Sequence, residues 1–466
     1  MGGAGRSAGL EKARAKMQAE GVDPVAIETF AHYYRLLEHG ETGLIPESSI
    51  EPVDMERLAD VEVPDEVAGE AVQRTVVIKL NGGLGTSMGL DRAKSLVCVR
   101  RGLSFLDIIA RQVLALRKQY DARLPVIFMN SFRTSSDTLE ALSRYGDLPV
   151  EGVPLEFLQN KEPKLLAKDL MPASHPVDPD LEWCPPGHGD IYTAIRSSGV
   201  LDLLIEQGFR HVFVSNSDNL GAVPDARVAG WFAQSGAPFA IEAVRRTPSD
   251  RKGGHFARRK ADGRIVLRET AQTAKEDQEA LRDLDRHRYC STNNLWFDLQ
   301  AMKSTLDQRE GILGLPLIRN VKHLDPADPS TPEVVQIETA MGAAIEVFEG
   351  SRLIEVGRDR FVPVKTTNDL LVLRSDVYEI RDDFVLQQLA SDLPFIDLDP
   401  DHYKLVGEFD KRFPEGAPSL AKAHSLKVEG DWTFEHGVQV VGDVELESDR
   451  SQRVPAGQVL TGPASG

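Results

Sequence analysis

The sequence predicts an α/β fold built on a mixed, mostly parallel β-sheet. Between Thr75 and about residue 380, β-rich runs alternate with helical runs, which is the order expected of strands joined by crossover helices. The first β-rich run, at 76–80, leads directly into a loop that holds four glycines. We therefore expect a sheet wrapped by helices, with ligand-binding loops at the carboxyl ends of its strands.

The elements of this main domain follow in order along the chain. Strands are predicted at 76–80, 124–130, 210–219 and 238–246. Helices are predicted at 103–120 and 191–208, from long runs with helical periodicity. The loops NGGLGTSMG, MNSF and SNSDN each follow a strand, so a parallel sheet brings them together at one rim.

Segments of different character flank the main domain, which we place at residues 75–380. Residues 1–74 contain two helical stretches and are predicted to form an extension packed on that domain. In the second stretch apolar side chains recur at helical spacing, at Ile27, Phe30, Tyr34 and Leu37.

Residues 381–466 form the third unit. Apolar residues alternate there between Gly430, Gly437 and Gly442, which predicts short strands joined by regular turns. The pattern alone fits a small β-helix and a plain meander equally well.

The composition argues against several classes of partner. The net charge of −18 disfavours a nucleic acid backbone or an anionic membrane as the main partner. Cys98, Cys184 and Cys290 lie far apart without metal or redox spacing, so we expect reduced core thiols. No stretch approaches the ~18 apolar residues of a membrane span, and the first residues lack a hydrophobic run. We therefore expect a cytoplasmic protein.

The glycine loop is the first candidate site. Glycines after a strand let the backbone approach a ligand closely, and phosphate or a nucleobase is the usual occupant. The dinucleotide pattern G-x-G-x-x-G fails because Met88 stands where its third glycine belongs, and the P-loop pattern fails because Leu90 follows Gly89. A tight corner without a ligand is the alternative.

Polar motifs elsewhere in the main domain suggest charge neutralisation. Asp218 follows an apolar strand, where a carboxylate can hold Mg²⁺ against phosphates or cap a helix. In WCPPGHGDIY, His188 offers a donor and Asp190 is expected to cap the following helix, although His188 also fits a structural role.

TNNLW and FVPVKTTNDL supply two more motifs. The carboxamides of TNNLW suit hydroxyl groups or a turn. Lys365 suits phosphates or a solvated surface. Two lysines, one aspartate and several amides around a glycine loop fit phosphoryl or nucleotidyl transfer.

The motifs together resemble one family. LNGGLGTSMG with KSL, FMNSFRTSSDT, PPGHGDIY, FVSNSDNLGA, TNNLWFDL, VVQIETAMGAA and FVPVKTTNDLLV are similar, in the same order, to the blocks of eukaryotic-type UTP–glucose-1-phosphate uridylyltransferases, also called UDP-glucose pyrophosphorylases. The resemblance extends from about Thr75 to Leu373.

The resemblance implies a fold and a reaction. The fold is a Rossmann-like nucleotidyltransferase domain of the glycosyltransferase-A-like kind, followed by a left-handed β-helix. The reaction joins UTP and glucose 1-phosphate into UDP-glucose and pyrophosphate, with Mg²⁺ as cofactor, by in-line attack on the α-phosphorus of UTP. The oligomeric state does not follow from the resemblance, and a homo-oligomer stays open.

The resemblance also implies a role for each matching residue. For the nucleotide it implies contacts from Leu80, Asn81, Gly82, Gly83, Lys94, Gln159, Gly187, Asp218 and Lys365. For the sugar phosphate it implies Gly83, His188, Asn216 and Asn293. Asp218 would hold the metal, and Lys94 and Lys365 would be the catalytic cations.

Three alternatives remain at this stage. A related UDP-sugar or UDP-N-acetylhexosamine pyrophosphorylase is one, although that glycine loop tends to read Ala-Gly-Gly-Gln-Gly-Thr. A catalytically silent UDP-sugar sensor is the second, and the joint presence of Lys94, Asp218 and Lys365 argues against it. A dinucleotide-dependent oxidoreductase is the third, disfavoured by the glycine spacing.

Overall fold

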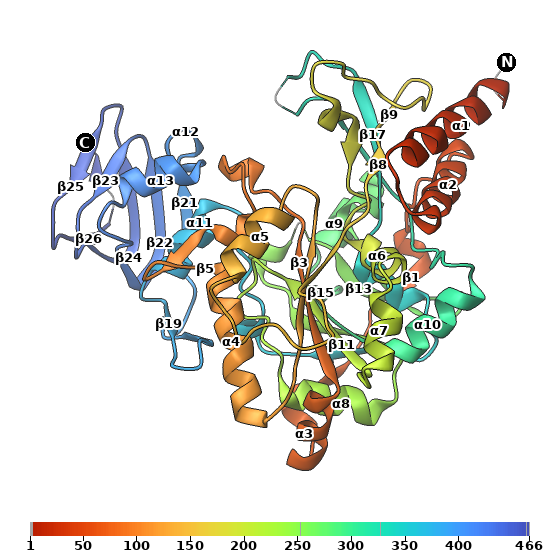
Figure 1. Ribbon diagram of the computed structural model, residues 1–466. Helices are drawn as coiled ribbons and strands as arrows, with labels where there is room; N and C mark the ends of the chain where they lie inside the picture. Colours follow the sequence, from red (N-terminus) through yellow and green to blue (C-terminus); the bar gives the residue numbers. More distant parts are fainter. Residues whose placement is uncertain (1–2, 252, 327, 463, 466) are drawn as a thin grey trace.

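The fold is built on its largest β-sheet. The computed structural model describes residues 3–251, 253–326, 328–462 and 464–465, and within them this sheet has eight strands with helices on both faces (Figure 1). Across the sheet the strands run in the order β2 (Glu56–Arg57), β18 (Arg352–Glu355), β12 (Phe239–Arg245), β15 (Tyr289–Asp298), β11 (His211–Asn216), β3 (Thr75–Asn81), β6 (Val126–Asn130) and β7 (Glu156–Leu158).

The strand directions confirm a mixed, mostly parallel sheet. Within this sheet only β15 runs antiparallel to its neighbours, β11 and β12. The remaining pairs, including β3 with β6 and with β11, are parallel. Because β3 is buried along nearly its whole length, it has apolar residues on both faces, as parallel strands covered on both faces do.

The helices divide into two layers. Val77 of β3 belongs to one core with α4 (Phe105–Tyr120) and α8 (Ala226–Ser235), whereas Val76 and Ile78 belong to the other. This alternation is the period of two that a strand imposes. The first layer also holds α3 (Asp65–Gln73), and the second holds α6 (Ile191–Ser197), α7 (Val200–Glu206) and α10 (Leu299–Gln308).

Helix boundaries follow local signals. The predicted helix at 103–120 begins after Ser104, whose side chain and that of Asp107 form a capping box. The predicted single helix at 191–208 was wrong, because it is divided into α6 and α7. Gly199 lies between them with φ +76°, a left-handed conformation that a helix interior does not adopt.

The N-terminal helices form a hairpin. The hairpin of α1 (Gly3–Ala19) and α2 (Pro24–Glu38) buries the predicted apolar stripe against a lobe beside the rim (Figure 1). That lobe consists of β8 (Glu162–Pro163), β9 (Leu165–Leu166), β10 (Trp183–Cys184), β16 (Ile318–His323) and β17 (Glu333–Glu338).

Two short strands before Thr75 extend the sheets. β1 (Ile50–Glu51) pairs with β13 (His255–Arg259), which pairs with β14 (Ile265–Arg268), and β2 pairs with β18 of the central sheet. The boundary at residue 74 therefore stays a proposal.

The C-terminal region forms stacked parallel strands. In one sheet β21 (Phe395–Leu398), β22 (Ser419–Glu429), β24 (Gln439–Glu447) and β26 (Val459–Thr461) pair in that order, all parallel. In a second sheet β23 (Trp432–Phe434) pairs in parallel with β25 (Gln452–Val454).

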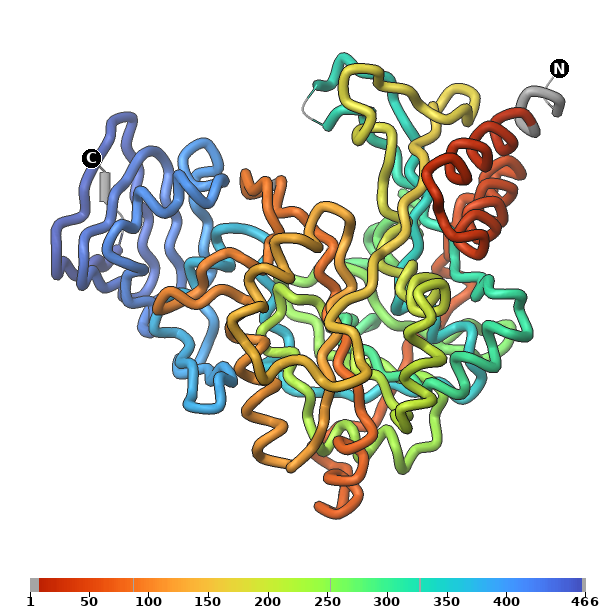
Figure 2. The backbone as a smooth tube through the Cα atoms, viewed as in Figure 1, coloured from red at the N-terminus to blue at the C-terminus, as the bar shows by residue number. Residues whose placement is uncertain are grey.

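From β22 to β26, successive strands therefore alternate between these two sheets. A plain meander is excluded because its neighbouring strands would be antiparallel. The left-handed sense of the coil stays a prediction. Figure 2 shows this unit at one side of the molecule, opposite the N-terminal hairpin.

The prediction that the cysteines are reduced thiols in the core is confirmed in part. Cys98, Cys184 and Cys290 are all free thiols, and the last two are buried. Cys98 is exposed, so its assignment to the core was wrong; it lies on β4 (Cys98–Arg100), a short hairpin strand at the surface. Among the described residues, no helix has the length and apolar character to cross a membrane.

We expect Gly430→Ala to destabilise the C-terminal unit more than Gly442→Ala. Both glycines have positive φ, +89° and +70°, which costs another residue ~1–2 kcal/mol. A Cβ at Gly430 would also overlap the carbonyl oxygen of Ser448, whereas one at Gly442 meets nothing. The overlap adds ~1–3 kcal/mol. Thermal denaturation of both variants checks this, and equal losses would contradict it.

Candidate active site

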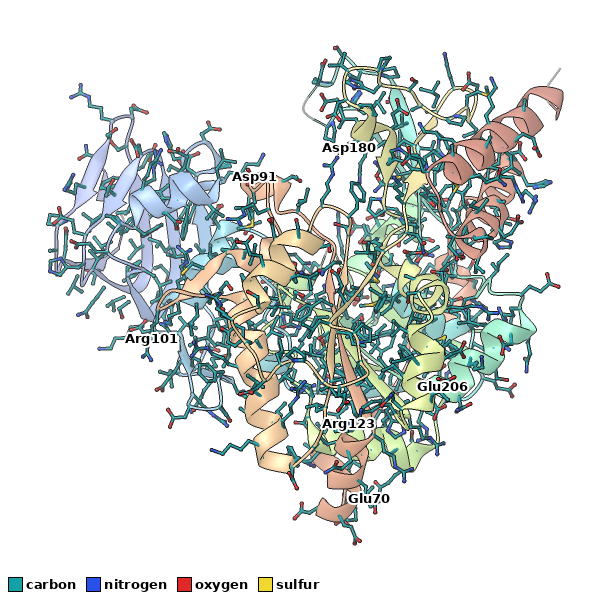
Figure 3. All side chains as sticks on the ribbon, in the orientation of Figure 1. Glu70, Asp91, Arg101, Arg123, Asp180 and Glu206 are labelled. Carbon is teal, nitrogen blue, oxygen red and sulfur yellow. The ribbon has the colours of Figure 1, made fainter. Side chains whose placement is uncertain are left out.

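The candidate site lies at the rim where β3, β6 and β11 end. The register pairs Leu80 with Asn216 and Asn81 with Asn130, so the loops after these strands begin side by side. In Figure 3, Asp91 of the glycine loop and Asp180 of the lobe lie at this end, whereas Glu70 and Arg123 lie at the opposite end. The predicted convergence of polar loops is confirmed.

Lys94 and Asp218 meet at the centre of the rim. The ammonium of Lys94 donates to Asp218 Oδ2 at 2.7 Å and also to the carbonyl of Val364. The backbone N–H of Val364 donates to the carbonyl of Asp218 at 3.1 Å. The glycine loop, the loop after β11 and the segment before Lys365 are thus joined at one point.

The sequence allowed two roles for Asp218, a ligand for Mg²⁺ and a helix cap. The next helix, α8, is capped by Asp225, whose carboxylate accepts from the N–H groups of Arg227 and Val228. Asp218 is therefore no helix cap. Its side chain is 23% exposed and that of Lys94 20%, so both can reach a ligand at the rim.

Lys365 lies beside this centre and is exposed. Its backbone N–H donates to Asp369 Oδ2 at 2.8 Å, which holds the start of α11 (Thr367–Arg374). The Lys365 ammonium also acts on Glu269: burial raises the pKa of this carboxyl, and the charge of Lys365 lowers it in part. The sequence did not predict Glu269 as part of the site, because no motif around it indicates that the charge of Lys365 acts on its carboxyl.

Gln159 lies between two glycines on the other side of the rim. Its backbone N–H donates to Asn130 O at 2.7 Å, and its amide donates to Gly187 O at 3.3 Å. A Cβ on Gly82 would overlap the amide oxygen of Gln159. Gly187 has φ +78°, and a Cβ there would lie 2.6 Å from Thr339 O. Close approach to Thr339 therefore requires glycine at Gly187, whereas a Cβ at Gly82 would displace the amide of Gln159.

The side chain of Asn81 has a structural task. Both donors of its amide are used within the protein, toward Asn130 Oδ1 at 2.8 Å and Thr138 Oγ1 at 2.9 Å. The backbone around it behaves differently: nothing lies within 4 Å of a Cβ built on Gly83. The open side of the loop is therefore its glycine backbone.

His188 is held in a defined tautomer. Its Nδ1 lies 3.0 Å from the backbone nitrogen of Met341 and accepts that N–H, while burial lowers the pKa of His188. A neutral imidazole that accepts at Nδ1 carries its proton on Nε2. His188 thus offers one donor to the site.

Asn293 protrudes from a β-bulge. The pairing of β12 with β15 shifts register between Ile241 and Ala243, and Asn293 has φ +58°. Its backbone N–H is bonded to Ser291 Oγ at 3.0 Å. Bulges of this kind redirect a side chain away from the plain strand alternation.

The prediction that Asp190 caps a helix was wrong. No capping bond from its carboxylate is seen in α6. Instead its oxygens accept from the backbone and side-chain N–H groups of Asn160, at 2.7 Å and 2.9 Å. Burial raises the pKa of Asp190 to about 6, which the bonds from Asn160 counteract in part. Asp190 therefore holds the loop that carries Gln159.

Lys79 is a buried lysine that the sequence did not predict as part of the site. It donates to Ser215 Oγ at 2.8 Å and Ala222 O at 2.7 Å, and so binds both ends of the loop that carries Asp218. Burial lowers its pKa to about 7. The available signal was a lysine inside the apolar run VVIKL.

The rim offers one carboxylate to a Mg²⁺ ion. Among the described residues no group of three or more acidic, histidine or cysteine side chains is placed to hold a metal ion. Mg²⁺ commonly takes one or two carboxylates and completes its shell with substrate phosphates and water. Asp218, a single carboxylate at the rim, fits that arrangement.

Comparison with known proteins agrees with this class of site. A rim built of a glycine backbone, lysines and one carboxylate defines a nucleotide-binding α/β protein of the nucleotidyltransferase kind. A sequence profile of the UTP–glucose-1-phosphate uridylyltransferase family matches residues 27–441. The chain belongs to this family.

Individual relatives cover most of the chain. The UTP–glucose-1-phosphate uridylyltransferase of Hordeum vulgare is 37% identical over 395 residues, covering 84% of this chain and 81% of the relative. That of Pyrus pyrifolia is 38% identical over 389 residues, covering 83% and 80%.

Solved structures are similar over nearly the whole length. A variant of the UDP-glucose pyrophosphorylase of Leishmania major, in complex with UDP-glucose, matches with a TM-score of 0.92 and 42% identity, covering 98% of this chain and 99% of the other. The UDP-glucose phosphorylase of Trypanosoma brucei matches with a TM-score of 0.90 and 40% identity, covering 97% and 98%.

We expect the backbone N–H of Asn160 to lose protection when the pH falls through about 6. The folded-state pKa of Asp190 is raised to about 6, so lowering the pH protonates a carboxylate that this N–H depends on. Losing the charge weakens the bond by ~1 kcal/mol, or about fivefold in exchange. Site-resolved hydrogen exchange, corrected for the intrinsic rate, measures this.

The neighbouring amide supplies the control. Gln159 donates to a backbone carbonyl that does not titrate, so its protection should not change over the same pH range. Asp190→Asn should abolish the pH dependence at Asn160. An identical pH dependence at Asn160 and Gln159 would contradict the assignment.

Proposed function

We propose that this chain transfers the uridylyl group of UTP to glucose 1-phosphate, giving UDP-glucose and pyrophosphate. The observation that carries the proposal is the meeting of Lys94, Asp218 and the segment before Lys365 at one point of the rim. Family membership and the resemblance to a UDP-glucose complex support it.

The glycine side of the rim is the proposed nucleotide site. Leu80, Asn81, Gly82 and Gly83 present backbone groups to the uracil and ribose, with Gln159 and Gly187 completing the pocket. The open space at Gly83 and the close packing of Gly82 against Gln159 support this assignment. Backbone donors and acceptors read a base edge without side-chain flexibility, which favours a defined orientation.

The proposed sugar-phosphate site adjoins the nucleotide site. His188 donates from Nε2, and Asn216 and Asn293 offer carboxamides to hydroxyl and phosphate oxygens. Gly83 lies at the junction of the two substrates. The tautomer set by the Met341 N–H and the bulge that carries Asn293 support these roles.

The transfer needs no side-chain nucleophile. A phosphate oxygen of glucose 1-phosphate attacks the α-phosphorus of UTP in line, and pyrophosphate leaves on the far side. The attacking oxygen already carries charge, so no general base is required. Lys94 and Lys365 neutralise phosphate charge on the two sides of the reacting centre.

The ion pair between Lys94 and Asp218 has a consequence for substrate entry. A triphosphate at the glycine loop offers Lys94 new anionic partners, and Asp218 is then free to take a cation. When bound at Asp218, Mg²⁺ supplies further neutralisation and orientation of phosphate oxygens. The pair therefore keeps both charges compensated before the substrates arrive.

We also propose a compartment, domain boundaries and the handedness of the C-terminal coil. Free thiols at Cys98, Cys184 and Cys290 suit a reducing compartment, and we propose the cytoplasm. We propose domain boundaries at residues 74 and 380 and a left-handed coil for the parallel strands after residue 381. A homo-oligomer remains open.

A pyrophosphate-release assay tests the function. UTP, Mg²⁺ and glucose 1-phosphate should give stoichiometric pyrophosphate and UDP-glucose, and activity should fall when galactose 1-phosphate or N-acetylglucosamine 1-phosphate replaces the sugar. Preference for one of these sugars would instead identify a related pyrophosphorylase. UTP binding without turnover would identify a sensor, and NAD(P)H binding would support an oxidoreductase.

We expect Asp218→Asn to lower kcat by ~10²-fold or more while the fold is retained. The loss of one preorganised charge at the reacting centre has this size. Steady-state kinetics at saturating Mg²⁺ measure the effect, and circular dichroism checks the fold. Asp23→Asn is the control, because Asp23 caps α2 in the N-terminal hairpin and asparagine caps equally well. Near wild-type turnover of Asp218→Asn would place the metal elsewhere.

The two lysines should differ in their effects. Lys94 is held within the glycine loop, so we expect Lys94→Ala to impair both UTP binding and turnover. Lys365 is exposed beside the centre, so we expect Lys365→Ala to lower mainly kcat, as for an interaction made in the transition state. Direct UTP binding and steady-state rates separate them, and the reverse pattern would refute the division.

A further inference from the structure

Beneath the rim lies a buried carboxylate that the proposed chemistry does not use. Glu242 of β12 is 0% exposed and its oxygens accept four hydrogen bonds. Two come from Arg360, from Nε at 2.6 Å and Nη2 at 2.7 Å, and the others come from Asn294 Nδ2 at 3.0 Å and Trp296 Nε1 at 2.9 Å. The pair with Arg360 is bidentate, the strongest geometry for such a contact.

Arg360 extends the network to the loop after β11. Its Nη1 donates to Val223 O at 3.0 Å, and its carbonyl accepts from Asn219 Nδ2 at 3.1 Å. The side-chain oxygen of Asn219 accepts in turn from the backbone N–H of Val362 at 2.9 Å. The loop after β11 and the segment from Arg360 onward therefore hold each other from both sides.

Each anchored residue adjoins a candidate site residue. Asn219 follows Asp218, and Asn294 follows Asn293, whose φ of +58° costs ~1–2 kcal/mol and needs fixed neighbours. The segment that begins at Arg360 leads to Lys365. One buried ion pair thus lies behind all three.

We propose that Glu242 and Arg360 are positioning residues, whose ion pair sets Asp218, Asn293 and Lys365 at the spacing that the reacting phosphates require. The inference rests on the proposed function and deepens it. Stability alone gives little reason for a charge pair here, because an apolar pair of similar volume is often as stable or more stable in a core. Placement matters far more for the transfer, since a ~1 Å displacement can cost ~10²-fold in rate.

The test uses two variants of the ion pair. One breaks the bidentate contact between Glu242 and Arg360, and the other replaces both charges so that no buried charge is left unpaired. We expect Arg360→Lys, which keeps the charge but cannot form the bidentate pair, to lower kcat by about tenfold or more. The double variant Glu242→Gln/Arg360→Met leaves no unpaired buried charge. Its melting temperature should approach that of the wild type while kcat stays about tenfold down.

Comparing the effect on kcat with the effect on KM for UTP gives a second measurement. KM for UTP should change by less than about threefold, because Gly82, Gln159 and Gly187 lie outside the network. The control is Arg245→Met, which removes the pair between the exposed Arg245 and Glu355, 2.9 Å apart on strands β12 and β18. That variant should keep kcat within about twofold of wild type.

The outcomes separate the two hypotheses. An inactive wild-type protein would refute the proposed function itself. An active wild type, together with a folded double variant or Arg360→Lys whose kcat lies within about twofold of it, would overturn the positioning role. Recovery of kcat together with melting temperature in the double variant would also overturn it, because a purely structural role predicts that result.

Discussion

The contact between the Lys94 ammonium, the Asp218 carboxylate and the Val364 carbonyl is the point on which the site depends. It joins segments that are far apart in the chain, and each of them carries part of the site. The contact is possible because β3 and β11 are parallel neighbours and end in register. A charge from the segment after each strand then meets its partner across the rim, where partial burial makes the interaction stronger than at an open surface.

Charge is also placed below the rim, where it is costly. Lys79, Glu242 and Arg360 are all buried, and desolvation of such groups must be offset by hydrogen bonds. The structure supplies them: Lys79 donates to the loop after β11, and Glu242 accepts bonds on both oxygens. The loop that carries Asp218 is therefore held from beneath by the side chains of Lys79 and Arg360, while its outer side remains open to ligand.

Several parts of the fold and site were predictable because their signals are local. The apolar run at 76–80 lies within the buried β3, and the predicted helix at 103–120 becomes α4. The division at Gly199 and the bonds of Asp190 to Asn160 were not predicted. In both cases the local signal admits two outcomes: a glycine is tolerated within a helix or ends it, and an aspartate at a helix start caps that helix or reaches a distant loop.

By itself the sequence determined the alternation of strands and helices, the polar character of the strand ends and the family, because periodicity and short motifs are properties of neighbouring residues. It left open which charges meet. The tertiary structure decided that Lys94 pairs with Asp218, that Arg360 pairs with Glu242, and that the C-terminal strands are parallel instead of forming a meander. Each of these depends on contacts between residues far apart in the chain, and only the register of the sheets brings such residues together.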